Sequence, residues 1–113
     1  MSEPDGASIR LIVSTIPEAS AAAFVRDLVE RRLIACGNIV PGVTSIYRWE
    51  GKIIEDAEAM LWMETTVERL PALRAVFDAA HPYDVSKFIE IAPSEWSQAF
   101  AAWVQSSTGG GGS

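Results

Sequence analysis

The segment 42–66, GVTSIYRWEGKIIEDAEAMLWMETT, constrains the fold of this chain more than any other part of the sequence. Two runs rich in β-branched and aromatic residues flank Glu50-Gly51, and this pattern predicts two strands that fold back on each other. The first run extends back to residue 35 and contains Pro41-Gly42, a pair that favours a bend or bulge. We therefore expect strands over 35–50 and 52–65. Sixteen extended residues span about 50 Å at ~3.3 Å each, so the hairpin should bend or project beyond its own domain.

The segments on either side predict the other elements. SIRLIVST at 8–15 is typical of a buried strand, and Thr15 with Glu18 has the spacing of a helix capping box. Apolar residues at helical spacing predict a helix over 17–33 and a second one capped by Thr65 or Thr66. The HPYD segment at 81–84 ends that second helix. A strand over 85–91 and a last helix that opens at Pro93-Ser94 complete the chain.

The resulting order, β-α-β-β-α-β-α, is that of the split βαβ or ferredoxin-like arrangement. It predicts an α+β fold in which an antiparallel sheet carries helices on one face. The 113 residues suit one domain, which we place at 8–106. We expect 1–7 to be disordered and 107–113 to be a flexible tail, because its GGGGS ending resembles an engineered linker.

Side-chain alternation places large apolar residues on the sheet face that the helices leave bare. Met60 and Trp62 share this face of the third strand, and Tyr47 and Trp49 share one face of the second. One interpretation is that the last helix, with Trp96 and Trp103, folds back over them. We favour burial against sister chains in a closed symmetric oligomer, in which Met60 and Trp62 form the subunit interface.

Composition excludes several function classes. The net charge is −6 and the nine basic residues are scattered, so we expect neither a nucleic-acid partner nor an anionic membrane surface. A single cysteine, Cys36, allows no internal disulfide, which fits a cytoplasmic location. No apolar run is long enough for a membrane span, and no nucleophile, phosphate-loop or metalloprotease motif indicates an enzyme.

The segments ACGNIVPGVTSIYRWEGKIIEDAEAMLWMETT and PALRAVFDAAHPYDV resemble the CutA divalent-cation tolerance protein family. The resemblance runs from about Ile9 to Val104. It implies a ferredoxin-like homotrimer, similar in architecture to the nitrogen-regulatory PII proteins, with the sheets facing the trimer interior and the hairpins reaching onto neighbours. The implied role is tolerance to divalent metals, copper above all.

The same resemblance bears on metal ligands. In some family members a cysteine late in the first strand and histidines before Pro-Tyr are the proposed ligands. Ser14 and Ala80 stand at two of these positions here, so His81 is the one candidate ligand for Cu(II) or another divalent cation. A hydrogen-bonded cap at the helix C-terminus is the other interpretation of His81. We expect no required cofactor.

The other metal-binding residue types are expected to be structural. Cys36 lies among apolar neighbours and is interpreted as a core residue. Met60 and Met63 point to opposite faces of a strand and cannot chelate one ion as a pair. The acidic run Glu55, Asp56 and Glu58 is expected to be a solvated edge.

A cleft is also expected next to the HPYD segment. Tyr83 and Asp84 follow a proline, and residues from a neighbouring subunit's hairpin are expected to face them: Tyr47, Trp49 and Lys52. By analogy with PII-like proteins, such a cleft would bind a small anionic ligand, although these residues also suit a sealed interface. Three functions therefore remain open: a metal-responsive trimer, a PII-like ligand- or protein-binding signalling trimer, and a trimer used as an engineered assembly scaffold.

Overall fold

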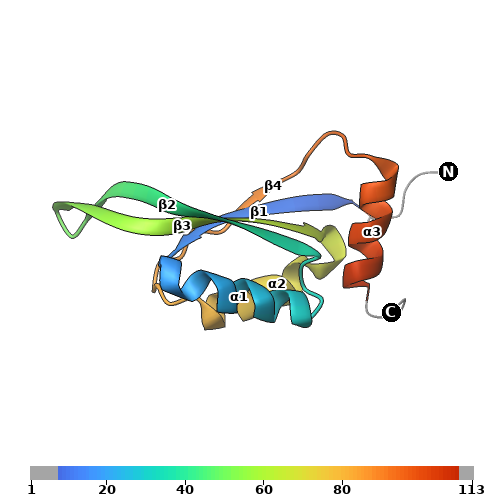
Figure 1. Ribbon diagram of the computed structural model, residues 1–113, viewed down its shortest axis with the longest axis horizontal. Helices are drawn as coiled ribbons and strands as arrows, with labels where there is room; N and C mark the ends of the chain where they lie inside the picture. Colours follow the sequence, from blue (N-terminus) through green and yellow to red (C-terminus); the bar gives the residue numbers. More distant parts are fainter. Residues whose placement is uncertain (1–7, 110–113) are drawn as a thin grey trace.

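A computed structural model describes residues 8–109 of the protein (Figure 1). In chain order, the elements are β1 (Ile9–Ile16), α1 (Glu18–Glu30), β2 (Cys36–Trp49), β3 (Lys52–Thr66), the 3-10 helix η2 (Val67–Arg69), α2 (Leu70–Ala80), β4 (Ile89–Ile91) and α3 (Gln98–Thr108). The order β-α-β-β-α-β-α is the predicted one. The α+β, ferredoxin-like fold is therefore confirmed.

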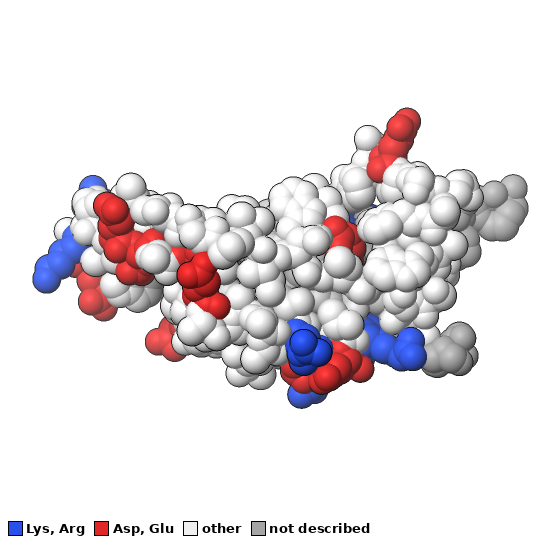
Figure 2. Space-filling model, viewed as in Figure 1, with Lys and Arg blue, Asp and Glu red and all other residues white. Residues whose placement is uncertain are grey.

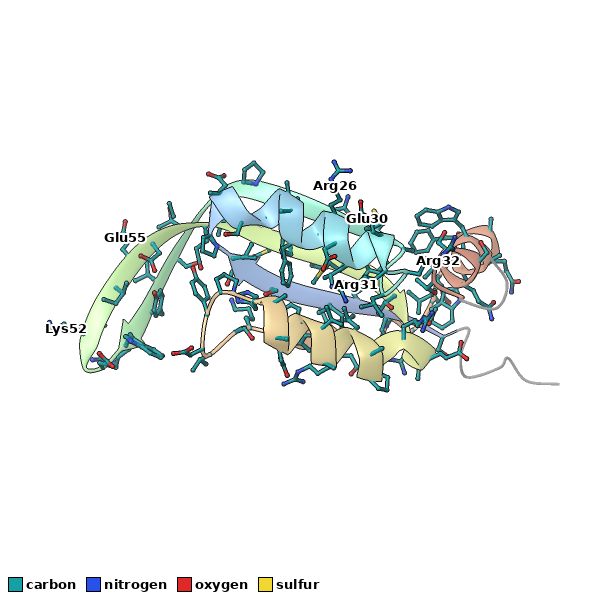
Figure 3. The ribbon with its side chains drawn as sticks, turned by 90° about the horizontal axis from the view of Figure 1, so that it is seen from below. Arg26, Glu30, Arg31, Arg32, Lys52 and Glu55 are labelled. Atoms are coloured by element: carbon teal, nitrogen blue, oxygen red, sulfur yellow. The ribbon has the colours of Figure 1, made fainter. Side chains whose placement is uncertain are left out.

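The four strands form one sheet in the order β2-β3-β1-β4, and all neighbouring strands are antiparallel. Helices α1 and α2 lie side by side along one face (Figures 1 and 3). The strand residues that point toward them are fully buried and form the core with Phe77 of α2: Ile12, Ile16, Ala59, Leu61 and Met63. We call the opposite face of the sheet the open face.

Helix α1 packs closely against the sheet at Gly37 of β2. A Cβ atom added to Gly37 would lie 2.5 Å from Cγ1 of Val25, closer than two carbon atoms can pack. Glycine at this position therefore lets α1 lie directly on the strand.

The hairpin of β2 and β3 gives the chain its elongated shape, with dimensions of 53 × 27 × 22 Å. Its turn is Glu50-Gly51, where both residues have positive φ, 50° and 80°, as in the tight turns that suit strand twist. The predicted bulge is also present: Val40 pairs with Met60 and Val43 with Glu58, so three steps on β2 match two on β3.

The bulge decides which way the outer half of β2 faces. Paired residues point to the same side of a sheet, so Val40 shares the open face with Met60. Without the extra residue, the alternation would place Tyr47 and Trp49 on the opposite side from Val40. With it, both aromatic side chains share the face of Met60 and Trp62. Gly42, at φ 71°, supplies the backbone conformation that the bulge requires.

Helix α3 lies at the end of the sheet opposite the hairpin (Figure 1). Its Val104 and Ala101 pack against Ile9 and Ala35 in a small second core. Trp62 nevertheless remains 38% exposed. The interpretation in which the last helix shields the open-face aromatics is therefore not what the structure shows.

The predicted helix caps were wrong. Thr15 still belongs to β1, and α1 follows Pro17 without a side-chain cap. The Glu18 carboxylate instead accepts a hydrogen bond from the backbone N–H of Gly42 at 2.8 Å, because the bulge brings β2 near the start of α1. Thr66 gives no side-chain cap either, and the Thr65 hydroxyl donates to the carbonyl of Leu33 at 2.7 Å.

Several boundaries also differ. α1 ends at Glu30 because the chain turns at Arg32, whose φ is 61°. The predicted strand 85–91 shortens to Ile89–Ile91, and α3 begins only at Gln98, capped by the Ser97 hydroxyl. α3 also includes 107–108, which were predicted as tail; 110–113 and 1–7 lie outside the described residues. Within the described range 8–109, no helix is long and apolar enough to cross a membrane.

Candidate functional site

A cavity of about 580 Å³ lies between the outer half of the hairpin and the loop that follows α2. Its volume is within the range of about 300–1,000 Å³ typical of small-molecule sites. Aromatic and charged side chains line it together: Tyr47, Trp49, Glu58, Tyr83, Asp84 and Lys87. We call this space the hairpin cavity.

Glu58 is the most enclosed charged residue of the hairpin cavity, with only 4% of its surface exposed. The Tyr83 hydroxyl donates a hydrogen bond to Oε2 of Glu58 at 2.5 Å. Burial raises the pKa of Tyr83 above its ordinary range, and Glu58 raises it further. Tyr83 therefore stays protonated at neutral pH and keeps donating to the carboxylate.

Tyr47 makes a similar contact on the hairpin itself. Its hydroxyl donates to Oδ2 of Asp56 at 2.5 Å, and this hydrogen bond is the main cause of its raised pKa. Tyr47 and Trp49 are 40% and 46% exposed, so these aromatic walls of the cavity are accessible in the single chain.

His81 fixes the loop that forms the other wall. Its Nδ1 accepts a hydrogen bond from the backbone N–H of Tyr83 at 3.1 Å, so Nε2 carries the proton and donates to the carbonyl of Thr15 at 3.0 Å. The ring is buried against Phe24 and Phe77. Burial lowers the pKa of His81, so the neutral form that these contacts require is favoured.

These contacts limit His81 as a metal ligand, because a ligating nitrogen would have to give up one of its two hydrogen bonds. Ser14 is fully buried in the core, and Ala80 is exposed at the end of α2. Across residues 8–109, no group of three or more His, Cys, Asp or Glu side chains is placed to hold a metal ion. Burial, with Glu64 nearby, raises the pKa of Cys36 and disfavours the thiolate that metals bind.

The structure brings together four of the five residues predicted to form a cleft. Tyr47, Trp49, Tyr83 and Asp84 line the hairpin cavity together within a single chain. Lys52 lies at the tip of the hairpin and is not among the lining residues (Figure 3).

Met60 and Trp62, the predicted interface residues, lie on the open face, where Met60 is half-buried. Val13 pairs with Trp62 on one side and Ile89 on the other, and Leu11 pairs with Ile91. Apolar side chains thus continue across all four strands of this face: Leu11, Val13, Val40, Met60, Trp62, Ile89 and Ile91. We call this set the open-face patch.

Glu58 and Thr15 are two of the cavity residues that the sequence interpretation missed, and Lys87 is another. Glu58 was assigned to a solvated acidic run, but the loop after α2 covers it and Tyr83 binds it. Thr15 was assigned to a helix cap, but it is a buried residue of β1 that lines the cavity. The available signal was alternation, because Glu58 shares its strand face with Met60 and Trp62.

Comparison with known proteins gives a consistent result. The model of the family described as CutA1 divalent ion tolerance protein matches residues 10–107. The divalent-cation tolerance protein CutA of Thermus thermophilus is 40% identical over 100 residues, which cover 88% of this chain and 97% of that protein. Human CutA is 37% identical over 91 residues, 80% of this chain but 51% of the human protein.

Solved structures show the same similarity. CutA1 from Oryza sativa matches with a TM-score of 0.87 at 31% identity, covering 93% of this chain and 97% of the other. The divalent ion tolerance protein CutA1 from Ehrlichia chaffeensis matches with a TM-score of 0.86 at 33% identity, covering 89% and 95% of the two chains.

Proposed function

Because this chain belongs to the CutA1 divalent ion tolerance family and has a role of that type in divalent-cation tolerance, we propose that it performs this role as a homotrimer. Its subunits pack through the open-face patch. It acts by binding, not by catalysis, and we expect it in the cytoplasm. Fractionation tests the location, since a relative from Archaeoglobus fulgidus is described as periplasmic.

The observation that carries the proposal is the continuity of the open-face patch over four strands. At its centre Trp62 is 38% exposed, and at its edge Ile89 and Ile91 are 48% and 37% exposed. Figure 2 shows acidic side chains over the hairpin and a mainly uncharged surface between the hairpin and α3. An apolar surface of this kind is a contact region, and copies of the same chain in a closed ring would bury it.

The hairpin supports the same conclusion. A two-stranded ribbon is only marginally stable in water, yet β2 and β3 continue well beyond the helices (Figure 1). Both strands of its outer half expose apolar side chains, Ile46 at 65% and Ile53 at 61%. Contact with neighbouring subunits would cover these residues and support the ribbon.

A charge placed in the open-face patch tests this assembly. Trp62→Glu should convert the trimer to single subunits, because a carboxylate would be buried without a partner. Val29→Glu is the matched control, since Val29 is similarly exposed, at 39%, but lies on α1. Sedimentation of both variants measures the change. A Trp62→Glu protein that sediments like the unmodified chain would contradict the proposal.

The proposed role requires no bound cofactor. If the protein binds Cu(II) or another divalent cation, His81 is the candidate ligand. Binding at His81 would have to displace its hydrogen bond to Tyr83 or to Thr15. Calorimetric titration of the full chain with Cu(II) and Zn(II) tests this, with His81→Ala as the comparison. A ligand role requires heat that disappears in His81→Ala, and no heat from either ion would contradict it.

The hairpin cavity favours a second function, binding of a small ligand. A volume of about 580 Å³ is in the range typical of small-molecule sites, and three aromatic and three charged side chains line it. This agrees with the PII-like hypothesis, while the scaffold hypothesis depends on a tail outside the described residues. Thermal shifts of the full chain across a panel of small molecules test it, and an unchanged melting temperature throughout would contradict it.

A further inference from the structure

We propose that the hairpin cavity binds a small organic cation, an alkylammonium or guanidinium compound. The inference rests on the second proposed function, that this cavity binds a ligand, and it names the chemical class of that ligand. All the cavity residues that this inference uses belong to one chain.

The first observation is the state of the Glu58 carboxylate. Glu58 lines the cavity, and only 4% of its surface is exposed. Among residues 8–109, its one hydrogen bond is from Tyr83 to Oε2, and Oε1 receives none. Oε1 of Glu58 is accessible from the cavity, whereas Oε1 of Glu64 is buried without a hydrogen-bond partner in the described range. A carboxylate oxygen that remains accessible on a largely buried residue can accept strong hydrogen bonds from charged N–H donors.

The second observation is the aromatic surface beside that carboxylate. Tyr47 and Trp49 come from the hairpin and Tyr83 from the facing loop, and all three line the same space. Aromatic faces attract ammonium and guanidinium groups through the ring quadrupole, and tryptophan does so best. Tyr47 and Tyr83 each donate their hydroxyl to a carboxylate, which makes the rings more electron-rich.

The third observation is the sign of the charge. Among the described residues, two carboxylates, Glu58 and Asp84, line the cavity, whereas only one ammonium group, that of Lys87, does. A third carboxylate, Asp56, lies next to the cavity and accepts the hydrogen bond of the Tyr47 hydroxyl. Lys87 and Asp84 are exposed, whereas Glu58 is buried, so the enclosed charge is negative. Lys52, which the sequence suggested as an anion contact, is at the hairpin tip. This distribution favours an organic cation over an anion.

A bare metal ion fits less well. Hard divalent cations take six or more oxygen ligands, and no group of three potential ligands is assembled anywhere in 8–109. An organic cation needs one carboxylate and aromatic contacts, and the hairpin cavity supplies both.

Calorimetry on the full chain tests the proposal with four probes. Butylammonium and agmatine supply the two cationic groups, butan-1-ol is the uncharged analogue of butylammonium, and citrate is the anion. We expect heat from at least one cationic probe and none from the alcohol or citrate. Glu58→Gln should weaken the binding at least about tenfold, because the amide can still accept from Tyr83 but carries no charge.

Glu55→Gln is the matched control, since it makes the same charge change at an exposed residue on the other face of β3 (Figure 3). It should bind the cation as the unmodified chain does. Trp49→Leu gives a second variant that leaves Glu58 untouched, and it should also weaken binding.

The outcomes separate the two proposals. Heat from citrate alone would overturn the cationic class and leave ligand binding at the cavity in place. No heat from any probe would overturn the cationic class, and an unchanged melting temperature across the panel of small molecules would overturn ligand binding as well. Equal binding by Glu58→Gln and Glu55→Gln would overturn the role of Glu58.

Discussion

Tyr83 and Glu58 are joined by a hydrogen bond of 2.5 Å between a loop and a strand that lie 25 residues apart in the sequence. The bond ties the segment after α2 to the hairpin, and it also satisfies one oxygen of a nearly buried carboxylate. One contact therefore positions a wall of the hairpin cavity and stabilises its charge.

Removing this hydroxyl should destabilise the fold. Tyr83→Phe leaves Glu58 Oε2 buried without a donor, which we expect to cost about 1–3 kcal/mol in the free energy of unfolding. Tyr47→Phe removes a comparable hydrogen bond at a side chain that is 40% exposed, so it should lower the stability less than Tyr83→Phe does. Urea denaturation of both variants measures the difference. Equal losses would mean that burial of Glu58 has no energetic consequence.

His81 predicts a loss of stability in mild acid. Burial lowers the pKa of His81 in the folded state below the ordinary 6.5 of the unfolded state. At a pH between the folded and unfolded pKa values, the unfolded chain therefore binds more protons than the folded chain. The stabilisation is complete above pH 6.5 and is lost as the pH falls below it. His81→Gln should flatten this dependence between about pH 5 and 7. Melting temperatures across that range test it, and an unchanged slope in the variant would contradict the assignment.

Glu64 predicts the opposite pH dependence. Burial raises its pKa from the ordinary 4.5, and its Oε1 is buried without a partner in the described chain. Its contribution to stability is complete below pH 4.5 and is lost as the pH rises through the folded-state value. Glu64→Gln should therefore raise the melting temperature at pH 7, whereas Glu55→Gln, at an exposed site, should not. A lower melting temperature for Glu64→Gln would show that the carboxylate is needed in the assembly.

A side chain at position 37 should destabilise the fold through its contact with one neighbour, Val25. Gly37→Ala would bring a methyl group to 2.5 Å from Val25 Cγ1 and should cost about 1–3 kcal/mol. Val25→Ala removes that atom, so the double variant should lose less than the sum of the single variants. Denaturation of the full cycle measures the coupling. Strictly additive losses would show that the close contact is relieved elsewhere.

The fold was largely predictable because its signals are local. Alternation along β3, helical spacing in α1 and α2, and the Glu50-Gly51 turn each depend on residues close in the sequence. The strand β4 was predicted too long because 85–88 carry apolar residues suited to a strand, yet only Ile89 to Ile91 pair with β1. Phe88 packs instead against Phe77 in the core, a contact that no local pattern reveals.

The hairpin cavity was only partly predictable for the same reason. Tyr47, Trp49, Tyr83 and Asp84 were identified from the hairpin and the HPYD segment. Glu58 was missed because its burial depends on where the loop after α2 crosses the sheet, and Lys52 was included because nothing local fixes how far the hairpin tip extends. Whether the open-face patch is covered by other copies depends on molecules that one sequence does not contain.

The mass of the unmodified chain in solution tests the central claim of self-association through the open face most directly. Light scattering at micromolar concentration should give about 37 kDa, the mass of three 12.2 kDa chains, as the main species. A stable, folded particle of 12.2 kDa at the same concentration would contradict it, because Trp62, Ile89 and Ile91 would then remain in water.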